Sequence, residues 1–320
     1  MSDRWDETPT EGKSEKAPTA GVPDAKPAAV AGPGGYADGL PLDDITYLEA
    51  KLILKPDLFT SAKALRDFGK IVQKTAAAMK LGFTLDPEFD APPKIREIVF
   101  ADTSDFALYG AAFILRRRIA YHEGFPVGAP EYVLKFRHPE LDRTAALDMR
   151  PRIGKYRIKF KAELLPLKDK VGGARVLYSH NCQFGLGQAK GADWMAIETL
   201  TEFFPALAKL ELKGERVSLV NGGIVEEVLL PIGVITFGSD LTARCDVALW
   251  RTRGDHYPLV GEFAFQAKFP SIAAVAAKPR QLCENFYIAL QHATEDRLAL
   301  GLTKTGMVYQ LNGASPQSHE

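Results

Sequence analysis

The sequence predicts an α+β protein that consists mainly of antiparallel strands. Many short stretches alternate apolar and polar residues with a period of two, which is typical of half-buried strands. The turn signals Asn221-Gly222-Gly223 and Arg253-Gly254-Asp255 separate neighbouring stretches in the way that hairpin turns do. Helical periodicity is confined to a few segments. This balance favours a sheet covered by a small number of helices.

The helical segments are predicted from their apolar stripes and from the residues at their ends. Thr60 can cap the first helix, which is expected to stop at Gly82. Asp193 can cap the second, and Pro205 is expected to break or kink it. A third helical region starts at Ser271.

The strands are predicted from period-two alternation between these helices. In chain order they are 46–54, 95–102, 111–120, 131–137, 155–164, 174–180, 216–220, 224–237, 243–251, 258–269 and 305–311. Because most neighbouring strands are joined by short connections, the sheet is expected to be antiparallel.

Composition limits the class of protein and its organisation. Residues 1–40 contain seven Ala, six Gly and five Pro, so 1–42 are expected to form a disordered tail, with 43–311 folded and 312–320 flexible. With 40 basic and 40 acidic side chains, the chain lacks the basic excess of a nucleic-acid coat, so nucleic acid is not expected as a partner. It has neither a long apolar run nor a basic, apolar N-terminal signal, so no membrane is expected. Three scattered cysteines indicate a reduced, cytoplasmic setting.

The most informative segment is 155–163, Lys-Tyr-Arg-Ile-Lys-Phe-Lys-Ala-Glu. Because strand side chains alternate between faces, one face carries only charged residues: Lys155, Arg157, Lys159, Lys161 and Glu163. On its own, this pattern is most often a half-buried strand with a solvated face.

Other predicted strands repeat the same choice of side chains. The pairs that share one face of a strand are Glu49 with Lys51, Arg116 with Arg118, Lys135 with Arg137, and Arg244 with Asp246, while Glu262 shares a face with Gln266 and Lys268. If these faces line one closed barrel, leaving the charges without partners there would be costly. Arg and Lys suit phosphate oxygens, and Asp and Glu suit Mg²⁺ or Mn²⁺. The pattern therefore indicates a cavity for a multiply anionic ligand with a divalent metal.

The order of these motifs resembles the CYTH or triphosphate tunnel metalloenzyme superfamily. The motifs that carry the resemblance are Leu48-Glu49-Ala50-Lys51, Val99-Phe100-Ala101-Asp102-Thr103, Phe113-Ile-Leu-Arg-Arg-Arg118, Leu134-Lys135-Phe136-Arg137, the basic strand that ends at Glu163, Cys245-Asp246-Val247-Ala248-Leu249 and Gly261-Glu262-Phe263-Ala264-Phe265. The resemblance implies an eight-stranded antiparallel tunnel with covering helices, a triphosphate or polyphosphate ligand, and hydrolysis at a phosphoanhydride. It also implies a role for each matching residue.

In that scheme Glu49 and Lys51 are catalytic, and Glu49, Glu163, Asp246 and Glu262 hold Mg²⁺ or Mn²⁺. The residues expected to bind the substrate are Arg116, Arg118, Lys135, Arg137, Arg157, Lys159, Lys161 and Arg244. Two positions depart from the family pattern, because Tyr47 and Ala264 stand where acids are usual. The hypothesis of a metal-dependent hydrolase therefore has an alternative, a module of the same fold that binds a phosphorylated ligand without cleaving it. An unrelated β-rich protein with solvated strand faces is a third reading.

Overall fold

The computed structural model describes residues 35–185, 193–238 and 241–311. It divides into two units, Met1–Leu42 and Asp43–Glu320. The described end of the first unit is a tight turn in which Gly35 bridges to Pro41. The tail predicted at 312–320, and most of the one predicted at 1–42, lie outside the described residues, so the domain boundaries stay predictions.

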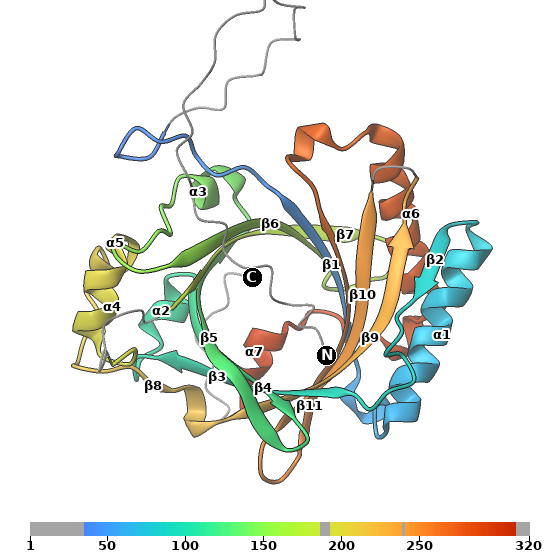
Figure 1. Cartoon of the computed structure of the whole chain (residues 1–320), viewed down its shortest axis with the longest axis horizontal. Coiled ribbons are helices and arrows are strands. Elements are labelled where there is room, and N and C mark those ends of the chain that lie inside the picture. Colours follow the sequence, from blue (N-terminus) through green and yellow to red (C-terminus); the bar gives the residue numbers. More distant parts are fainter. Residues whose placement is uncertain (1–34, 186–192, 239–240, 312–320) are drawn as a thin grey trace, which may run out of the picture. The chain divides into compact units, whose positions relative to one another are not determined.

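The second unit is a closed, mixed β-barrel of nine strands, which confirms the predicted α+β barrel (Figure 1). Around the barrel the order is β9-β10-β11-β1-β6-β7-β5-β4-β3, and β3 pairs with β9 to close it. The strands are β1 Tyr47–Leu54, β2 Gly82–Leu85, β3 Lys94–Asp102, β4 Phe113–His122, β5 Phe125–His138, β6 Tyr156–Pro166, β7 Ala174–Phe184, β8 Ser218–Leu219, β9 Val225–Thr236, β10 Thr242–Thr252 and β11 Pro258–Lys268. The short strands β2 and β8 pair with β9 and β3 outside this ring.

The strand count and one pairing differ from the expectation of eight antiparallel strands. The ring has nine strands, and β1 runs parallel to β6, with Glu49 opposite Glu163. A closed ring can alternate strand direction throughout only when its strand number is even. An odd number therefore requires a parallel neighbour, and β1–β6 is that pair.

The helices are α1 Ala62–Ala78, α2 Ala107–Gly110, α3 Leu141–Ala145, α4 Ile197–Phe203, α5 Pro205–Ala208, α6 Ala277–Ala293 and α7 Lys304–Tyr309, with 3₁₀ turns at Pro56–Leu58, Val220–Gly222, Ile272–Ala274 and Glu295–Arg297. Helices α1 and α6 pack on the outer faces of β9, β10, β11 and β1, where Phe68 and Phe286 join one apolar cluster. Helices α4 and α5 join a second cluster with β4, β5 and β7. None of the helices in the described part of the chain is long and apolar enough to cross a membrane.

The predicted helix ends are shifted by local backbone geometry. Ser61 rather than Thr60 caps α1, accepting a hydrogen bond from the N–H of Ala64 at 3.2 Å. The helix ends before Gly82 because Lys80 already takes the left-handed conformation, with φ 57°. Pro205 separates α4 from α5, as predicted.

The other helix starts differ from the prediction. Asp193 accepts a hydrogen bond from the N–H of Met195 four residues before α4 begins, so it closes a turn instead of capping that helix. Ser271 caps the 3₁₀ turn that precedes α6. In both places the side chain accepts a backbone N–H within a turn that precedes the helix, because Asp and Ser can make this hydrogen bond in several types of turn.

The predicted strand 305–311 is wrong, because this segment forms α7. Thr303 caps the helix, accepting a hydrogen bond from the N–H of Gly306 at 3.0 Å. Val308 and Tyr309 then pack with Ile53 and Trp250 in a third apolar cluster. A short apolar run fits either a strand or a helix, and here packing inside one end of the barrel selects the helix. Figure 1 shows α7 within the ring of strands.

The two faces of most barrel strands differ in character, although the apolar side chains of Ile53, Phe100 and Trp250 share a face with charged residues near α7. Apolar side chains of one parity, such as Ala50, Leu134 and Phe263, pack under the outer helices. The charged side chains of the other parity therefore face the barrel interior. The charged faces predicted from sequence thus line one shared interior.

Candidate functional site

Glu163 lies at the centre of an ion-pair network inside the barrel, and it is fully buried. Its carboxylate accepts hydrogen bonds from Lys51 Nζ at 2.8 Å and Lys135 Nζ at 2.5 Å. Ser179 Oγ donates to the same carboxylate at 2.5 Å, and Arg137 Nη1 lies 3.6 Å away. Burial acts to raise the pKa of Glu163, but Lys135 and Lys51 outweigh it and hold the pKa well below its ordinary value. The charged form of Glu163 therefore organises cations from β1 and β5.

Glu49 and Lys51, predicted as the catalytic pair, lie on the same face of β1. Lys51 Nζ is 3.0 Å from Glu49 Oε2, and Lys161 Nζ is 3.3 Å from the same oxygen. Burial acts to raise the pKa of Glu49, but Lys161 and Lys51 outweigh it and lower that pKa. Burial acts to lower the pKa of Lys51, but Glu163 and Glu49 outweigh it and raise that pKa. Both residues are thus charged and mutually stabilised.

A second part of the interior carries more positive than negative charge. Arg116 and Arg118 of β4 share one carboxylate, Glu131 Oε1, at 4.0 and 3.4 Å. Arg157 and Lys159 of β6 have no Asp or Glu oxygen of the described residues within 4.0 Å. Around these side chains the structure supplies less negative charge than positive charge.

Tyr47 supplies neutral contacts to the β6 cations. Its hydroxyl accepts a hydrogen bond from Arg157 Nη2 at 3.2 Å. The ammonium groups of Lys159 and Lys161 lie 5.7 and 5.8 Å from the centre of its ring. Tyr47 therefore packs against cations without neutralising them.

The electrostatic cost of this arrangement is visible in the pKa values. Burial lowers the pKa of Lys159 to about 8, and the charges of Lys161 and Arg157 add to the effect. Burial likewise lowers the pKa of Arg118 to about 9, with Arg116 as the largest neighbouring charge. These cations repel one another in the free protein, and a bound polyanion would relieve that repulsion.

The acids predicted on β10 and β11 have other partners than Glu49 and Glu163 have. Glu262 Oε1 is 2.6 Å from Lys304 Nζ of α7. Asp246 Oδ1 is buried and has no hydrogen-bond partner. Burial raises the pKa of Asp246 to about 6, while Arg96 and Arg244 oppose that shift. The charge of Arg244, which is predicted to bind substrate, therefore lowers the pKa of a neighbouring acid, Asp246.

Sequence reasoning missed five interior residues: Arg96, Glu131, Ser179, Glu227 and Lys304. The first four lie on barrel strands with inward parity, so extending the period-two argument to every strand would have found them. Lys304 had no such signal, because it precedes the predicted strand 305–311. It reaches the interior only because α7 packs inside the barrel.

The four carboxylates predicted as metal ligands do not form a ready metal site. Glu49 and Glu163 are paired with lysines of β1 and its neighbours, and Glu262 is paired with Lys304. Within 35–185, 193–238 and 241–311, no three His, Cys, Asp or Glu side chains are grouped so that they could hold a metal ion. As they stand, these donors suit the ammonium groups beside them better than a divalent metal. The assignment of Mg²⁺ or Mn²⁺ to these four residues stays a prediction.

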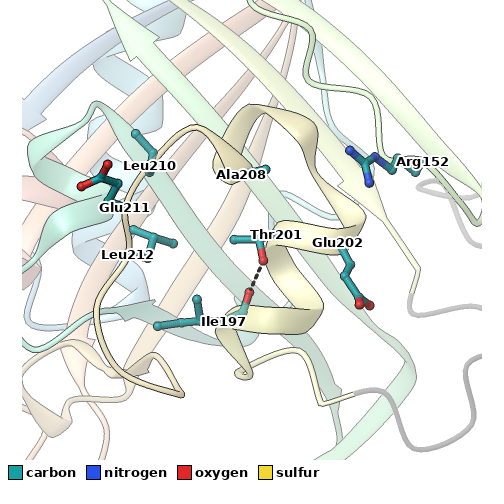
Figure 2. A pocket seen from close by; sticks show the side chains of 8 residues that line it. All are labelled: Arg152, Ile197, Thr201, Glu202, Ala208, Leu210, Glu211 and Leu212. Carbon is teal, nitrogen blue, oxygen red and sulfur yellow. Dashed lines mark hydrogen bonds between the residues drawn. The ribbon is translucent and has the colours of Figure 1, made fainter.

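A surface pocket lies outside the barrel, over α4 and α5 (Figure 2). It measures about 360 Å³, and its lining includes Arg152, Glu202 and Glu211 beside apolar side chains. Figure 2 shows Thr201 Oγ1 bonded to the Ile197 carbonyl at 2.9 Å, a hydrogen bond within α4 itself. None of the predicted site residues lines this pocket, so it is separate from the barrel interior.

Neither the protein-family models nor the curated proteins include a match to this chain. Among solved structures, the chain is similar to a candidate adenylyl cyclase from Hippeastrum that is described as having a dominant triphosphatase activity. The identity is 12% and the TM-score 0.41, over 85% of this chain and 98% of that one. It is also similar to a candidate adenylate cyclase from Bacillus halodurans, at 13% identity and TM-score 0.34, over 82% and 95% of the two chains. A third, from Vibrio parahaemolyticus, has 9% identity and TM-score 0.35, over 83% and 99%.

These likenesses concern the fold alone and carry no conclusion about substrate or reaction. The closed barrel with its inward charges is the tunnel that the order of the motifs predicts. It is also the fold that the resemblance of these motifs to the CYTH superfamily implies, apart from the ninth strand and the parallel pair.

Proposed function

We propose that the barrel interior binds inorganic triphosphate or a compound that contains a triphosphate. The observation that carries this proposal is the group of buried cations on β4 and β6 that is only partly neutralised. Arg116 and Arg118 share Glu131, while Arg157 and Lys159 contact Tyr47 and have no Asp or Glu oxygen of the described residues within 4.0 Å. A ligand with several negative charges supplies what this group lacks.

The geometry also suits phosphate rather than a single carboxylate. Arginine donates two parallel N–H groups to a phosphate, and lysine adds a compact charge. The cations come from β4, β5 and β6, which lie within one arc of four consecutive strands, and so they form a continuous basic wall instead of converging on one point. Lys135, Arg137 and Lys161 are already paired with acids, and so we assign them to the edge of the ligand.

Hydrolysis of a phosphoanhydride is the reaction that we propose for this ligand, and one observation favours it over binding alone. Asp246 is a buried carboxylate without a hydrogen-bond partner on Oδ1. Its pKa, raised to about 6 by burial, is that of a base able to accept a proton from water near neutral pH. The surrounding cations would stabilise the charge of the transferred phosphoryl group. Mg²⁺ or Mn²⁺, with Lys51 and Glu49 as the catalytic pair, remains the predicted arrangement for this step.

The experiment is phosphate release from inorganic triphosphate, measured with Mg²⁺, with Mn²⁺ and with EDTA, beside the unfolding temperature of each mixture. Metal-dependent release supports the hydrolase. A raised unfolding temperature without release supports a binding module. If neither phosphate release nor a raised unfolding temperature is observed, the proposal is contradicted and the interior charges have a structural role.

Matched variants connect the result to the cations. Arg118→Ala and Lys159→Ala are expected to weaken triphosphate binding by roughly tenfold or more, because each removes a buried charge from the proposed contact. Lys63→Ala removes a lysine whose side chain is 81% exposed, and it is expected to leave binding unchanged. Unchanged binding in both tunnel variants would refute the assignment of these residues.

A further inference from the structure

Lys304 is placed inside the barrel among acidic side chains. Its ammonium lies 2.6 Å from Glu262 Oε1 and 3.8 Å from Glu227 Oε1, and 4.3 Å from the centre of the Trp250 ring. Trp250 Nε1 in turn donates to Glu227 Oε1 at 2.9 Å. The Lys304 side chain is 19% exposed, so this is an interior contact rather than a surface ion pair.

The helix that carries Lys304 is anchored at its other end. Tyr309 stacks on Tyr109 with ring centres 4.1 Å apart, and its hydroxyl donates to Asp102 Oδ2 at 2.8 Å. Asn221 Nδ2 donates to the carbonyls of Val308 and Tyr309 at 2.9 and 3.0 Å. These contacts bind α7 to β3 and to the segment before β9. The position of the Lys304 ammonium is therefore built into the fold.

The acids around Lys304 would have a different use without it. Glu227 and Glu262, which Lys304 contacts, lie on β9 and β11 with inward parity, and Asp246 lies with the same parity on β10 between them. Arg96 already pairs with Glu227 at 2.6 Å. Carboxylate oxygens from adjacent strands are the ligands that Mg²⁺ and Mn²⁺ prefer. Lys304 supplies positive charge at the place where a divalent ion would supply it.

We propose that Lys304 is a tethered cation that takes the place of a divalent metal at Glu262 and Glu227 and excludes the metal from them. Two observations carry this: the direct contacts of its ammonium with both carboxylates, and the anchored helix that holds it there. The Lys304 ammonium contacts the carboxylate oxygens that would otherwise bind the metal, and its positive charge repels an incoming divalent ion. A metal that serves the proposed hydrolysis would then lie at other carboxylates of the interior, a consequence that rests on the proposed function.

The test is a titration with Mn²⁺ alone, in which electron paramagnetic resonance measures the free ion. The proteins are the full-length wild type, Lys304→Met, which keeps the apolar stem over Trp250, and Lys304→Arg, which keeps the charge. We expect Lys304→Met to bind one Mn²⁺ more tightly than the wild type by roughly tenfold or more. Lys304→Arg is expected to behave as the wild type. Adding Glu262→Gln to Lys304→Met should remove the gained site.

Two outcomes would overturn the proposal. One is a folded Lys304→Met protein that binds Mn²⁺ no better than the wild type. The other is tight Mn²⁺ binding by the wild type that Glu262→Gln abolishes, and this arm needs no Lys304 variant to fold. Triphosphate binding by the wild type is measured separately, both with Mn²⁺ and in EDTA. Its absence under both conditions would refute the proposed function while leaving the Mn²⁺ comparison intact.

Discussion

Replacing Glu163 with Gln removes the negative charge around which the interior cations are arranged. The carboxylate is fully buried and contacts Lys51 at 2.8 Å, Lys135 at 2.5 Å and Arg137 at 3.6 Å. The amide keeps nearly the same shape, and its oxygen can still accept from Ser179. The change therefore isolates the charge from the packing.

The expected cost follows from the cations left behind. Breaking a buried ion pair by removing one partner typically costs about 3–5 kcal/mol, because the other charge stays buried without compensation. Glu49 still contacts Lys51 at 3.0 Å, which limits the loss on that side. We therefore expect Glu163→Gln to lower the free energy of unfolding by about 3 kcal/mol. The same change raises the net positive charge of the interior by one, so triphosphate should bind the variant more tightly, by roughly tenfold.

Urea unfolding with and without triphosphate, both in EDTA, measures the two effects. Asp67→Asn is the matched control, because it makes the same kind of change on a side chain that is 40% exposed, and it should alter the free energy of unfolding by less than about 0.5 kcal/mol. Triphosphate is expected to stabilise Glu163→Gln more than the wild type. A variant as stable as the wild type, or one that triphosphate stabilises less, would refute the charge argument.

Three further predictions use other residues of the interior. Burial and neighbouring cations lower the pKa of Lys159 to about 8, so its charge is present below that pH and lost above it. The affinity for triphosphate, measured by calorimetry, should therefore fall as the pH rises through 8. An affinity that does not change with pH would contradict this prediction. Burial raises the pKa of Asp246 from 3.8 to about 6, so its ionised form destabilises the fold above pH 6. In urea unfolding, Asp246→Asn should be more stable than the wild type by roughly 2–3 kcal/mol at pH 8. This difference in stability should disappear by pH 4. Ala264 lies between Lys51 and Asp246 across the sheet, so Tyr47→Glu combined with Ala264→Glu should increase Mn²⁺-dependent phosphate release. A double variant that binds triphosphate but stays inert would show that missing carboxylates are not what limits hydrolysis.

The charged strand faces were predictable because strand alternation is a local property. Once 155–163 is a strand, Arg157, Lys159 and Glu163 must share a face, whatever lies beside them. The same reasoning placed Glu49 with Lys51 and Arg116 with Arg118 correctly. It could not say which charges would meet, because the strands β1 and β6 are distant in sequence and their register is set by pairing.

The role of the acids could not be predicted in this way. The sequence predicts both Glu163 and Glu262 as metal ligands and does not distinguish between them. In the structure Glu163 contacts three cations from other strands, and Glu262 contacts Lys304, the first residue of the helix that replaces the predicted strand 305–311. A period-two run of about six residues does not distinguish a strand from a short buried helix, because both can hide apolar side chains. Only packing inside the barrel decides between them.

By itself, then, the sequence determined the strand-rich α+β class and the parity of the charged faces. These depend on residue type and on the spacing of neighbours along one strand. The tertiary structure decided that nine strands close with one parallel pair and that Glu163 gathers Lys51, Lys135 and Arg137. It also decided that Lys304 enters the acidic side of the interior. Those features depend on contacts between distant segments, and such contacts exist only once the barrel has closed.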